Sequence, residues 1–279
     1  MDSPLKPFRF PGGEAHIKDV DQDIGQFRYQ IADIRGASAE DLVMASMWGQ
    51  AVRARDEKSV VFLPYLPGAR ADRGVPDLHT YTSLVAEITA DQMVYLDPHS
   101  PVWVNDYQDM DDIAVMTEFP FERIIRREIQ DATSDIRPMP YTGVIAPDKG
   151  AVERATRAAH VMGVPVYKAG KTRDFETGKL TGFHMEDELP SGNFLIVDDI
   201  CDGGGTFVGL GEEILQSSED ISLSLWVTHG IFSKGTGFLY SIFDHIYTTN
   251  SHPGSVEAHN DQRATVIDVT PYLIESINV

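Results

Sequence analysis

The chain has 279 residues, of which 42% are hydrophobic, and its 23 Lys and Arg against 43 Asp and Glu give a formal net charge of −20. This length suffices for two domains with buried cores, and the acidic balance argues against nucleic-acid binding, which requires a basic surface. No apolar run is long enough to span a membrane, and Cys201, the single cysteine, cannot form an internal disulfide.

The first residues lack the basic-then-apolar order of a signal peptide. A lone cysteine suits a reducing compartment. We therefore expect a cytoplasmic protein that acts on small molecules, without a nucleic-acid or membrane partner.

Short apolar segments alternate with helix-like segments along the chain. Strands are expected at 59–63, 93–96, 143–146, 164–167, 194–197 and 223–228, and helices at 80–89, 151–162 and 206–215. This alternation predicts an α/β fold with mainly parallel sheets flanked by helices. The pattern breaks at 134–140, Ser-Asp-Ile-Arg-Pro-Met-Pro, which indicates a domain boundary near 128–139.

Residues 194–206 are the most informative segment. An apolar strand, 194–197, is followed by Asp198 and Asp199, and the loop after them leads into a helix. That loop contains Asp202, Gly203, Gly204, Gly205 and Thr206. Glycines let backbone N–H groups turn inward, and a helix N-terminus attracts anions, so the segment predicts a phosphate-binding cradle.

The carboxylates of this segment need a separate explanation, because they would repel a bare phosphate. Asp198 and Asp199 make sense as ligands of ribose hydroxyls or of a magnesium ion that the phosphates also bind. Cys201 is either a nucleophile or a packing residue beneath the loop. No thiol-activating pattern accompanies it, which favours packing.

The segment resembles the ribose-phosphate loop of type I phosphoribosyltransferases. Further motifs narrow the resemblance to the phosphoribosyl pyrophosphate (PRPP) synthetases, in that family's order and over most of the chain. They are residues 10–14 (Phe-Pro-Gly-Gly-Glu), 62–73 (Phe-Leu-Pro-Tyr-Leu-Pro-Gly-Ala-Arg-Ala-Asp-Arg), 97–100 (Asp-Pro-His-Ser), 146–154 (Ala-Pro-Asp-Lys-Gly-Ala-Val-Glu-Arg), 171–173 (Lys-Thr-Arg) and 228–233 (Thr-His-Gly-Ile-Phe-Ser).

The resemblance implies two similar phosphoribosyltransferase-type domains, each a mainly parallel sheet flanked by helices. The expected domains are residues 1–133, on which 266–279 packs back, and residues 134–265. The first would hold ATP and the second the ribose phosphate. In the family the hairpin of residues 10–14 reaches into a neighbouring subunit's site, which implies a homo-oligomer, a dimer or a hexamer.

The implied reaction is transfer of the β,γ-diphosphate of ATP to the C1 hydroxyl of a ribose, with release of AMP. Lys171 and Arg173 match the family's catalytic cations, and His99 and Asp148 match its magnesium-associated positions. The matching ATP-site residues are Phe10, Glu14, Arg70, Asp72 and His99. Asp198, Asp199 and the loop from Asp202 to Thr206 would bind the ribose phosphate, with Mg²⁺ as cofactor and ATP as co-substrate.

Three positions depart from the family pattern. Gly12 and Ala71 replace nucleotide-contacting side chains, and Gly203 replaces the threonine that caps the sugar's terminal 5-phosphate. A loop that has lost this hydroxyl gains room for a phosphate that continues into a second group. The acceptor is therefore either ribose 5-phosphate, which gives PRPP, or ADP-ribose, which gives its 1-pyrophosphate for NAD resynthesis.

Two readings from other classes stay open. A phosphoribosyltransferase that consumes PRPP would need neither the N-terminal hairpin nor Lys171 and Arg173. A non-catalytic regulatory homologue would be favoured by loss of these cations or of Asp198 and Asp199, all of which are present.

Overall fold

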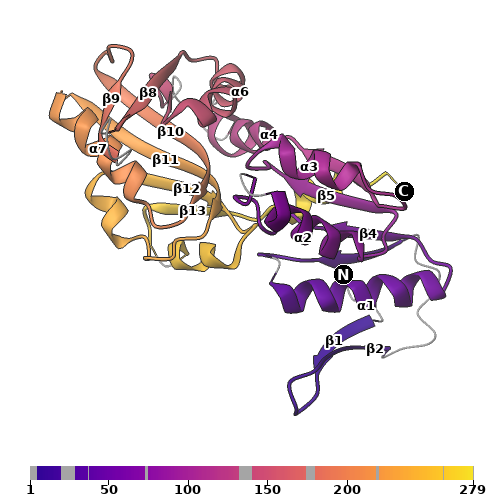
Figure 1. Cartoon of the computed structure of the whole chain (residues 1–279). Coiled ribbons are helices and arrows are strands. Elements are labelled where there is room, and N and C mark those ends of the chain that lie inside the picture. The colour runs from indigo at the N-terminus through magenta and orange to yellow at the C-terminus, as the bar shows by residue number, and fades with distance from the viewer. Residues whose placement is uncertain are drawn as a thin grey trace. The chain divides into compact units, whose positions relative to one another are not determined.

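The computed structural model describes residues 5–19, 29–36, 38–72, 75–131, 140–173, 180–217, 220–259 and 261–278 (Figure 1). The chain divides into two compact units, Met1–Phe119 with Thr270–Val279, and Pro120–Val269. The division lies at Pro120, ahead of the boundary expected at 133/134, because helix α4 (Phe121–Ile125) packs on helix α6 (Val152–Met162) of the second unit. Most of the proline-containing segment 134–140 lies outside the described residues.

The first unit contains a four-stranded parallel sheet. Its strands lie in the order β3 (Gln30–Asp33), β4 (Ser59–Phe62), β5 (Gln92–Leu96) and β6 (Val115–Phe119). Three helices contribute large side chains to its core: α1 (Ala39–Ala54), α2 (Val75–Ala86) and α3 (Pro101–Gln108). The buried strand β4 and these helix faces form one hydrophobic cluster, which fixes the positions of the loops between them.

Two further segments complete this unit. Strands β1 (Leu5–Arg9) and β2 (Ala15–Asp19) form an antiparallel hairpin whose Leu5 is buried in the same cluster. The C-terminal segment begins with α8 (Thr270–Ile274). The buried Gln92 of β5 binds it at two points, donating to the Ser276 carbonyl at 2.8 Å and accepting from the Asn278 N–H at 3.0 Å.

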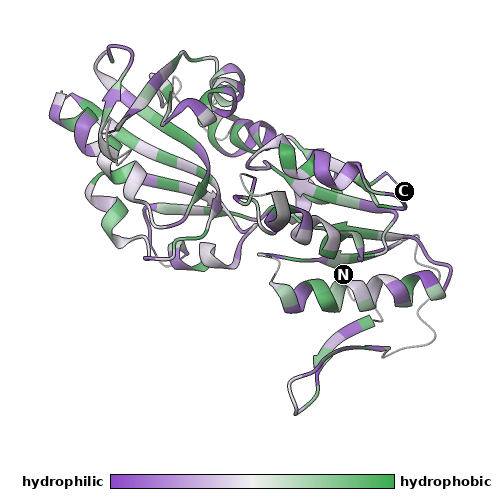
Figure 2. Ribbon diagram, in the orientation of Figure 1, coloured by the Kyte–Doolittle hydropathy of each residue, from purple (hydrophilic) through white to green (hydrophobic). Residues whose placement is uncertain are grey.

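The second unit contains a seven-stranded sheet that is parallel except for β9. The order is β13-β12-β11-β10-β7-β8-β9. The strands are β7 (Gly143–Ala146), β8 (Val166–Arg173), β9 (Leu180–Met185), β10 (Gly192–Cys201), β11 (Ile221–Gly230), β12 (His245–Thr249) and β13 (Ala264–Ile267). Figure 2 shows green, hydrophobic stretches on the strands of this sheet, interspersed with pale and purple ones. The central segments of β10 and β11 are buried, as expected for strands with both faces covered.

Helices α6 and α7 (Gly205–Ser217) flank the central strands of the second sheet. The π-helical turn η1 (Arg126–Asp131) continues α4, and the 3₁₀ turns η2 (Lys149–Ala151), η3 (Gly237–Ser241) and η4 (Pro253–Ala258) lie in connections. Gly163 ends α6 in a left-handed conformation, φ +68°, which glycine adopts without strain.

The α/β class with parallel sheets is confirmed. A strand overlaps each expected range, although the strand expected at 164–167 begins only at Val166 and runs on to Arg173. Strand 143–146 has the predicted bounds, whereas β10 and β11 extend beyond the predicted 194–197 and 223–228 at both ends. Helix α2 ends at Ala86, earlier than the expected 89. The longest helix, α1, was not predicted, although Ser38 and Asp41 form a capping box at its start.

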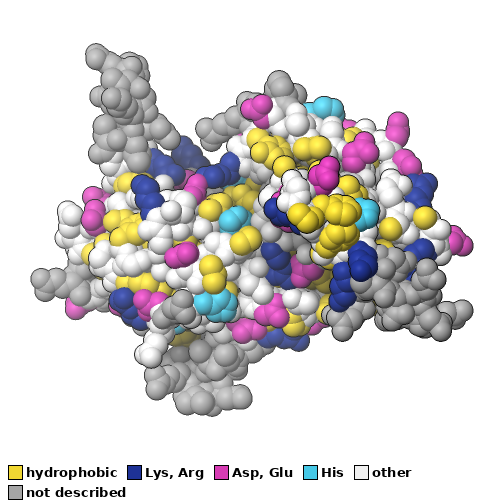
Figure 3. Space-filling model, turned by 90° about the horizontal axis from the view of Figure 1, so that it is seen from below, with side chains coloured by type: hydrophobic (Ala, Val, Ile, Leu, Met, Phe, Trp, Pro, Cys, Tyr) yellow, Lys and Arg dark blue, Asp and Glu magenta, His cyan; other side chains and the backbone are white. Residues whose placement is uncertain are grey.

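The surface mixes side chains of all kinds. On the face in Figure 3, hydrophobic, acidic and basic side chains are interspersed. Large hydrophobic side chains stay exposed on the helices of the first unit, namely Val43, Met47, Tyr81, Leu84 and Val102. In the described part of the chain, no helix combines the length and the apolarity that a membrane crossing requires.

Candidate functional site

The candidate site of the second unit lies where neighbouring parallel strands end. Strands β8, β7, β10 and β11 are adjacent in the sheet. Asp148 follows β7, Lys171 lies near the end of β8, and Asp198 and Asp199 lie near the end of β10. Carboxyl ends of parallel strands meet at one edge, where α/β proteins bind ligands. The fold thus gathers at one edge residues that are far apart in sequence.

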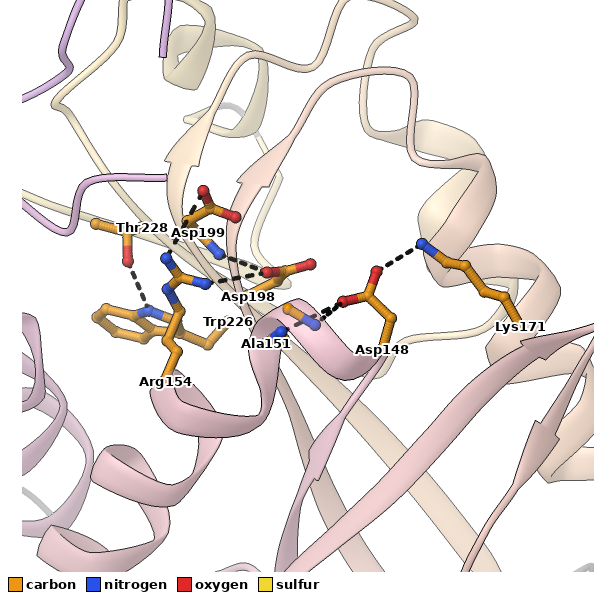
Figure 4. A network of polar contacts seen from close by, with 9 residues as sticks. Asp148, Ala151, Arg154, Lys171, Asp198, Asp199, Trp226 and Thr228 are labelled. Carbon is orange, nitrogen blue, oxygen red and sulfur yellow. Dashed lines mark hydrogen bonds and ion pairs between the residues drawn. The ribbon is translucent and has the colours of Figure 1, made fainter. Parts of the chain in front are cut away.

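Asp198 and Asp199 share one cation, Arg154 of α6 (Figure 4). The guanidinium nitrogens lie 3.5 Å from Asp198 Oδ1 and 3.7 Å from Asp199 Oδ2. The side chains of Arg154 and Asp199 are 9% and 5% exposed, and that of Asp198 is 17% exposed. Burial, followed by the Asp199 carboxylate, raises the pKa of Asp198 well above its ordinary value, although Arg154 opposes this. A ligand that donates hydrogen bonds or brings positive charge would relieve this pair.

Lys171, near the end of β8, pairs with Asp148, which follows the adjacent strand β7. The ammonium Nζ lies 2.6 Å from Asp148 Oδ2, while Oδ1 accepts from the N–H groups of Gly150 and Ala151 at 3.0 and 3.3 Å (Figure 4). Burial acts to raise the pKa of Asp148, but Lys171 and these N–H groups outweigh it, and the pKa lies below its ordinary value. Asp148 therefore stays charged at neutral pH and holds the Lys171 ammonium close to the strand ends.

The glycine loop has two different kinds of glycine. Gly204 has φ +67°, and a Cβ there would lie 2.7 Å from Phe238 Cζ and 2.9 Å from Leu239 Cδ2. Gly204 is thus required by both backbone and packing. Gly203 does not have a positive φ, and a Cβ there would make only ordinary contacts, the nearest 3.5 Å from Lys234 Cε. Helix α7 begins directly afterwards, at Gly205, so Thr206 lies in its first turn.

The segment after β11 is bonded to the loop through the backbone. The N–H groups of Ile231 and Phe232 donate to the Cys201 carbonyl at 2.9 and 3.0 Å, and the Ser233 N–H donates to the Asp202 carbonyl at 3.2 Å. These bonds bring residues 231–234 alongside the glycine loop. Lys234 reaches the loop in this way, a neighbour that the sequence analysis missed because nothing in its local pattern indicates it.

Cys201 packs beneath the loop, in the hydrophobic core of the unit. Burial, with the charges of Asp198 and Asp202, raises the pKa of the thiol to about 12. Such a thiol is not ionised at neutral pH, so the packing interpretation holds and the nucleophile interpretation is wrong.

The structure also defines the surroundings of Arg154 and His229. Arg154, the last residue of motif 146–154, supplies the cation between the two carboxylates, a role that the sequence did not predict. Its spacing of six residues from Asp148, across the start of a helix, was the signal available. His229 is buried, and its Nδ1 lies 2.7 Å from Ser251 Oγ.

Arg173 ends β8, where its backbone pairs with Leu180 of β9. Its side chain lies outside the described part of the structure, as do those of residues 174–179. Lys171 and Arg173 therefore belong to the hairpin formed by β8 and β9. The hairpin packs on α7: a Cβ on Gly209 would lie 2.4 Å from the Phe183 ring of β9.

In the first unit, the tip of the β1–β2 hairpin carries Phe10 and Glu14. Phe10 is 45% exposed, and its ring stacks on His16 at 5.5 Å and meets the edge of Phe8 at 4.8 Å. Gly13, with φ +97°, closes the turn, and the Phe10 N–H donates to the Glu14 carbonyl. The hairpin thus presents a preformed aromatic surface, to which His16 contributes without having been predicted.

Arg70, Asp72 and His99 also lie in the first unit, in loops at the carboxyl ends of two neighbouring strands. The loop after β4 carries Arg70, which is exposed, and Asp72; the loop after β5 carries His99, also exposed. The Trp103 indole N–H donates to the Pro67 carbonyl at 2.8 Å and holds the first loop. Asp97, buried and at φ +40°, turns the chain into the second loop.

The two residues expected at the magnesium site, His99 and Asp148, belong to different units. Among the described residues, no group of three or more His, Cys, Asp or Glu side chains is arranged to hold a metal ion. The Asp148 carboxylate is a suitable hard ligand, but one oxygen bonds backbone N–H groups and the other bonds Lys171. Asp148 thus fits an ion that takes most of its ligands from phosphates and water, not a site built wholly from protein side chains.

Comparison with known proteins agrees with the motifs. The chain is 26% identical over 247 residues to a ribose-phosphate pyrophosphokinase from Maricaulis maris, covering 84% of this chain and 75% of that protein. It is 27% identical over 258 residues to a ribose-phosphate pyrophosphokinase from Pyrococcus furiosus, covering 89% and 86%. No family model matches the chain.

Among solved structures, phosphoribosylpyrophosphate synthetase from Mycobacterium smegmatis matches with a TM-score of 0.74 and 21% identity, over 97% of this chain and 88% of that one. This match shows the fold, with its two phosphoribosyltransferase-type domains. The sequence matches run over most of both chains and so add sequence similarity to the shared fold. The chain is thus similar in sequence, over most of its length, to ribose-phosphate pyrophosphokinases.

Proposed function

We propose that the chain is an ATP-dependent diphosphokinase. It transfers the β,γ-diphosphate of ATP to the C1 hydroxyl of a 5-phosphoribosyl acceptor and releases AMP. The observation that carries the proposal is the meeting, at one sheet edge, of a glycine-rich phosphate loop, a carboxylate pair on Arg154 and the Lys171–Asp148 pair. The names of the relatives agree with this reaction.

The acceptor would bind along β10 and the start of α7. The first N–H groups of a helix have no partner within it, so those of Gly205 and Thr206 can donate to the 5-phosphate, aided by the helix dipole. Asp198 and Asp199 would accept hydrogen bonds from the ribose hydroxyls. Such donors would offset the excess negative charge of the two carboxylates, which share the single guanidinium of Arg154.

In the chemical step, the C1 oxygen forms a bond to the β-phosphorus. The bond from that phosphorus to the oxygen bridging to the α-phosphorus breaks, and AMP leaves. Negative charge grows on the bridging and equatorial oxygens, so positioned cations stabilise the transition state. Lys171 and Arg173 are the candidates, and Lys171 would leave Asp148 for a phosphate oxygen when substrates bind.

Magnesium would neutralise charge on the ATP diphosphate. Asp148 is the carboxylate of the second unit best suited to hold it, once Lys171 has moved to a phosphate. His99 is the corresponding candidate of the first unit. Removing divalent cations with EDTA is expected to abolish turnover, and restoring Mg²⁺ is expected to recover it.

ATP would bind to the first unit through Arg70 and Asp72, and its adenine would lie on the aromatic hairpin. The exposed Phe10 ring offers a face for stacking, and Glu14 can accept from the exocyclic amine. We propose a homo-oligomer in which this hairpin serves a neighbouring subunit, which light scattering on the purified protein would test.

The acceptor is ribose 5-phosphate or ADP-ribose. To test the function, the protein is incubated with ATP, Mg²⁺ and each acceptor, and AMP and ADP are quantified. AMP without ADP, dependent on one of the acceptors, supports the proposal. Dominant ADP would indicate single-phosphoryl transfer, and diphosphate release from PRPP with a base would indicate a phosphoribosyltransferase.

A further inference from the structure

Lys234 lies beside the glycine loop and was not among the expected site residues. Its position is fixed by the backbone, because residues 231–233 bond to Cys201 and Asp202 and the Gly235 N–H donates to the Phe232 carbonyl at 2.8 Å. Phe232 at φ +47° and Gly235 at φ +73° bracket this turn. A buried phenylalanine held at positive φ indicates that the surrounding packing determines the turn.

The Lys234 side chain extends over Gly203. Its Cδ, Cε and Nζ lie 3.7, 3.5 and 3.8 Å from the place that a Cβ on Gly203 would occupy. Lys234 is exposed, and within the described ranges it forms no ion pair. An unpaired ammonium next to a helix N-terminus adds positive potential at the loop of a chain whose net charge is −20.

The absence of a side chain at Gly203 is not a folding requirement. The adjacent Gly204 is needed for its positive φ and its contact with Phe238, but neither reason applies to Gly203. The space above Gly203 is bordered on one side by the Lys234 ammonium. The place that a side chain at position 203 would take is therefore lined by the Lys234 side chain, whose ammonium can meet additional negative charge there.

Resting on the function proposed above, we propose that Lys234 is a specificity-determining residue that binds the second phosphate of a diphosphate-linked acceptor. The first phosphate would take the N–H groups at the start of α7. The next phosphate would pass over Gly203, within reach of the Lys234 ammonium. Lysine suits this role because its charge lies at the end of a flexible side chain and can follow the phosphate, whereas the guanidinium of arginine requires a fixed geometry.

Binding of acceptors without ATP tests this directly. Calorimetric titration would compare ADP-ribose and ribose 5-phosphate on the wild type, Lys234→Met, Lys234→Arg and the control Lys58→Met. Lys58 is an exposed lysine directly before β4, at the opposite edge of its sheet from the loops, where it pairs with Asp91 at 2.5 Å. Its replacement matches the charge change of Lys234→Met at a place remote from the glycine loop in the chain. Mg²⁺ is omitted so that the protein's own cations are measured.

Lys234→Met is expected to weaken ADP-ribose binding about tenfold, the loss of one charge-assisted hydrogen bond, and ribose 5-phosphate binding by about twofold or less, since that ligand has no second phosphate to lose. Lys234→Arg should retain most of the affinity, and Lys58→Met should match the wild type. The difference between wild type and Lys234→Met should shrink as salt rises, which a purely structural effect would not do.

Equal weakening for both acceptors, no change for either, or the same effect from Lys58→Met would overturn the role of Lys234. So would failure of the wild-type protein to bind ADP-ribose. The proposed reaction can fail independently of the role of Lys234. If Lys234→Met selectively loses affinity for ADP-ribose but the wild type forms no AMP, the diphosphokinase activity is rejected and the binding role of Lys234 is retained.

Discussion

Lys171 donates a 2.6 Å hydrogen bond to Asp148 and so joins the end of β8 to the turn after β7. The bond holds a mobile cation at the strand ends without exposing it fully, since 23% of the lysine side chain is accessible. Asp148 is itself fixed by two backbone N–H groups at the start of η2. The pair therefore holds the Lys171 ammonium at the edge of the sheet where β7 and β8 end.

Lys171→Ala and Arg173→Ala are each expected to lower kcat about a hundredfold or more, the scale of losing an oriented transition-state charge partner. KM for the acceptor should change much less, because such cations act mainly on charge that develops in the transition state. Steady-state kinetics of AMP formation, with Lys58→Met as the charge control, measure both constants. Near-wild-type turnover in both variants would remove these residues from the mechanism.

Asp198→Asn is expected to stabilise the protein at neutral pH while impairing acceptor binding. The carboxylates of Asp198 and Asp199 share Arg154, and replacing Asp198 with Asn removes the excess negative charge. Because the folded-state pKa of Asp198 is raised, the wild type binds a proton more readily when folded, so its stability rises as pH falls from that pKa toward about 4. The stability advantage of Asp198→Asn over the wild type should therefore be largest near pH 7 and should disappear toward pH 4.

Thermal unfolding of both proteins across this pH range measures the effect. A variant less stable than the wild type at pH 7, or an advantage that grows on acidification, would contradict the raised pKa. Asp198 would then be a carboxylate whose charge is fully compensated by Arg154.

A structural feature could be predicted from the sequence when the residues that specify it lie within one short segment. The run 194–197 and the glycines after it specify a strand, a tight turn and a helix within one segment, so the loop was predictable. Motif spacing also located Asp148 and Lys171. Their mutual contact was not predictable, because it follows from β7 and β8 being neighbours in the sheet.

The residues that were missed are placed by distant parts of the chain. Lys234 reaches Gly203 only because residues 231–233 bond to the backbone of residues 201 and 202, which no periodicity reveals. Arg154 faces Asp198 because α6 packs on β10. Helix α1 is different, because the signal available for it was local: Ser38 and Asp41 form a capping box at its start.

Gly209→Ala is expected to lower kcat about tenfold by displacing the β8–β9 hairpin, since a misplacement of the order of 1 Å can cost as much as a hundredfold. The added Cβ would lie 2.4 Å from the Phe183 ring, so β9 must move away from α7. Acceptor binding should be nearly unchanged, because the loop before α7 is not displaced.

A matched control is Gly182→Ala, in the same hairpin, where a Cβ would meet no atom within 4 Å. Adding Phe183→Leu to Gly209→Ala should restore part of the turnover, because the smaller side chain relieves the clash. If Gly209→Ala and Gly182→Ala behave alike, packing of the hairpin on α7 does not position Lys171.

Gly203→Thr should lower activity on ADP-ribose more than on ribose 5-phosphate. The new Cβ and methyl would occupy the space beside Lys234, and the hydroxyl would suit a terminal phosphate, a bond of about 1–3 kcal/mol to a charged group. The backbone at Gly203 accepts a side chain without strain, so the fold should be retained, whereas Gly204→Thr should unfold the loop. The ratio of the two activities is the quantity to measure, and an unchanged ratio would separate Gly203 from acceptor choice.

The central claim is diphosphoryl transfer, and the fate of the β-phosphate of ATP tests it most directly. ATP labelled in its β-phosphate is incubated with Mg²⁺ and the acceptor that supports turnover, and the products are separated and followed by ³¹P NMR. We predict that the label moves quantitatively to the acceptor as the inner phosphate of a 1-diphosphate, with unlabelled AMP formed in equal amount. Label remaining in ADP, or appearing as free diphosphate without a labelled acceptor, would contradict the account.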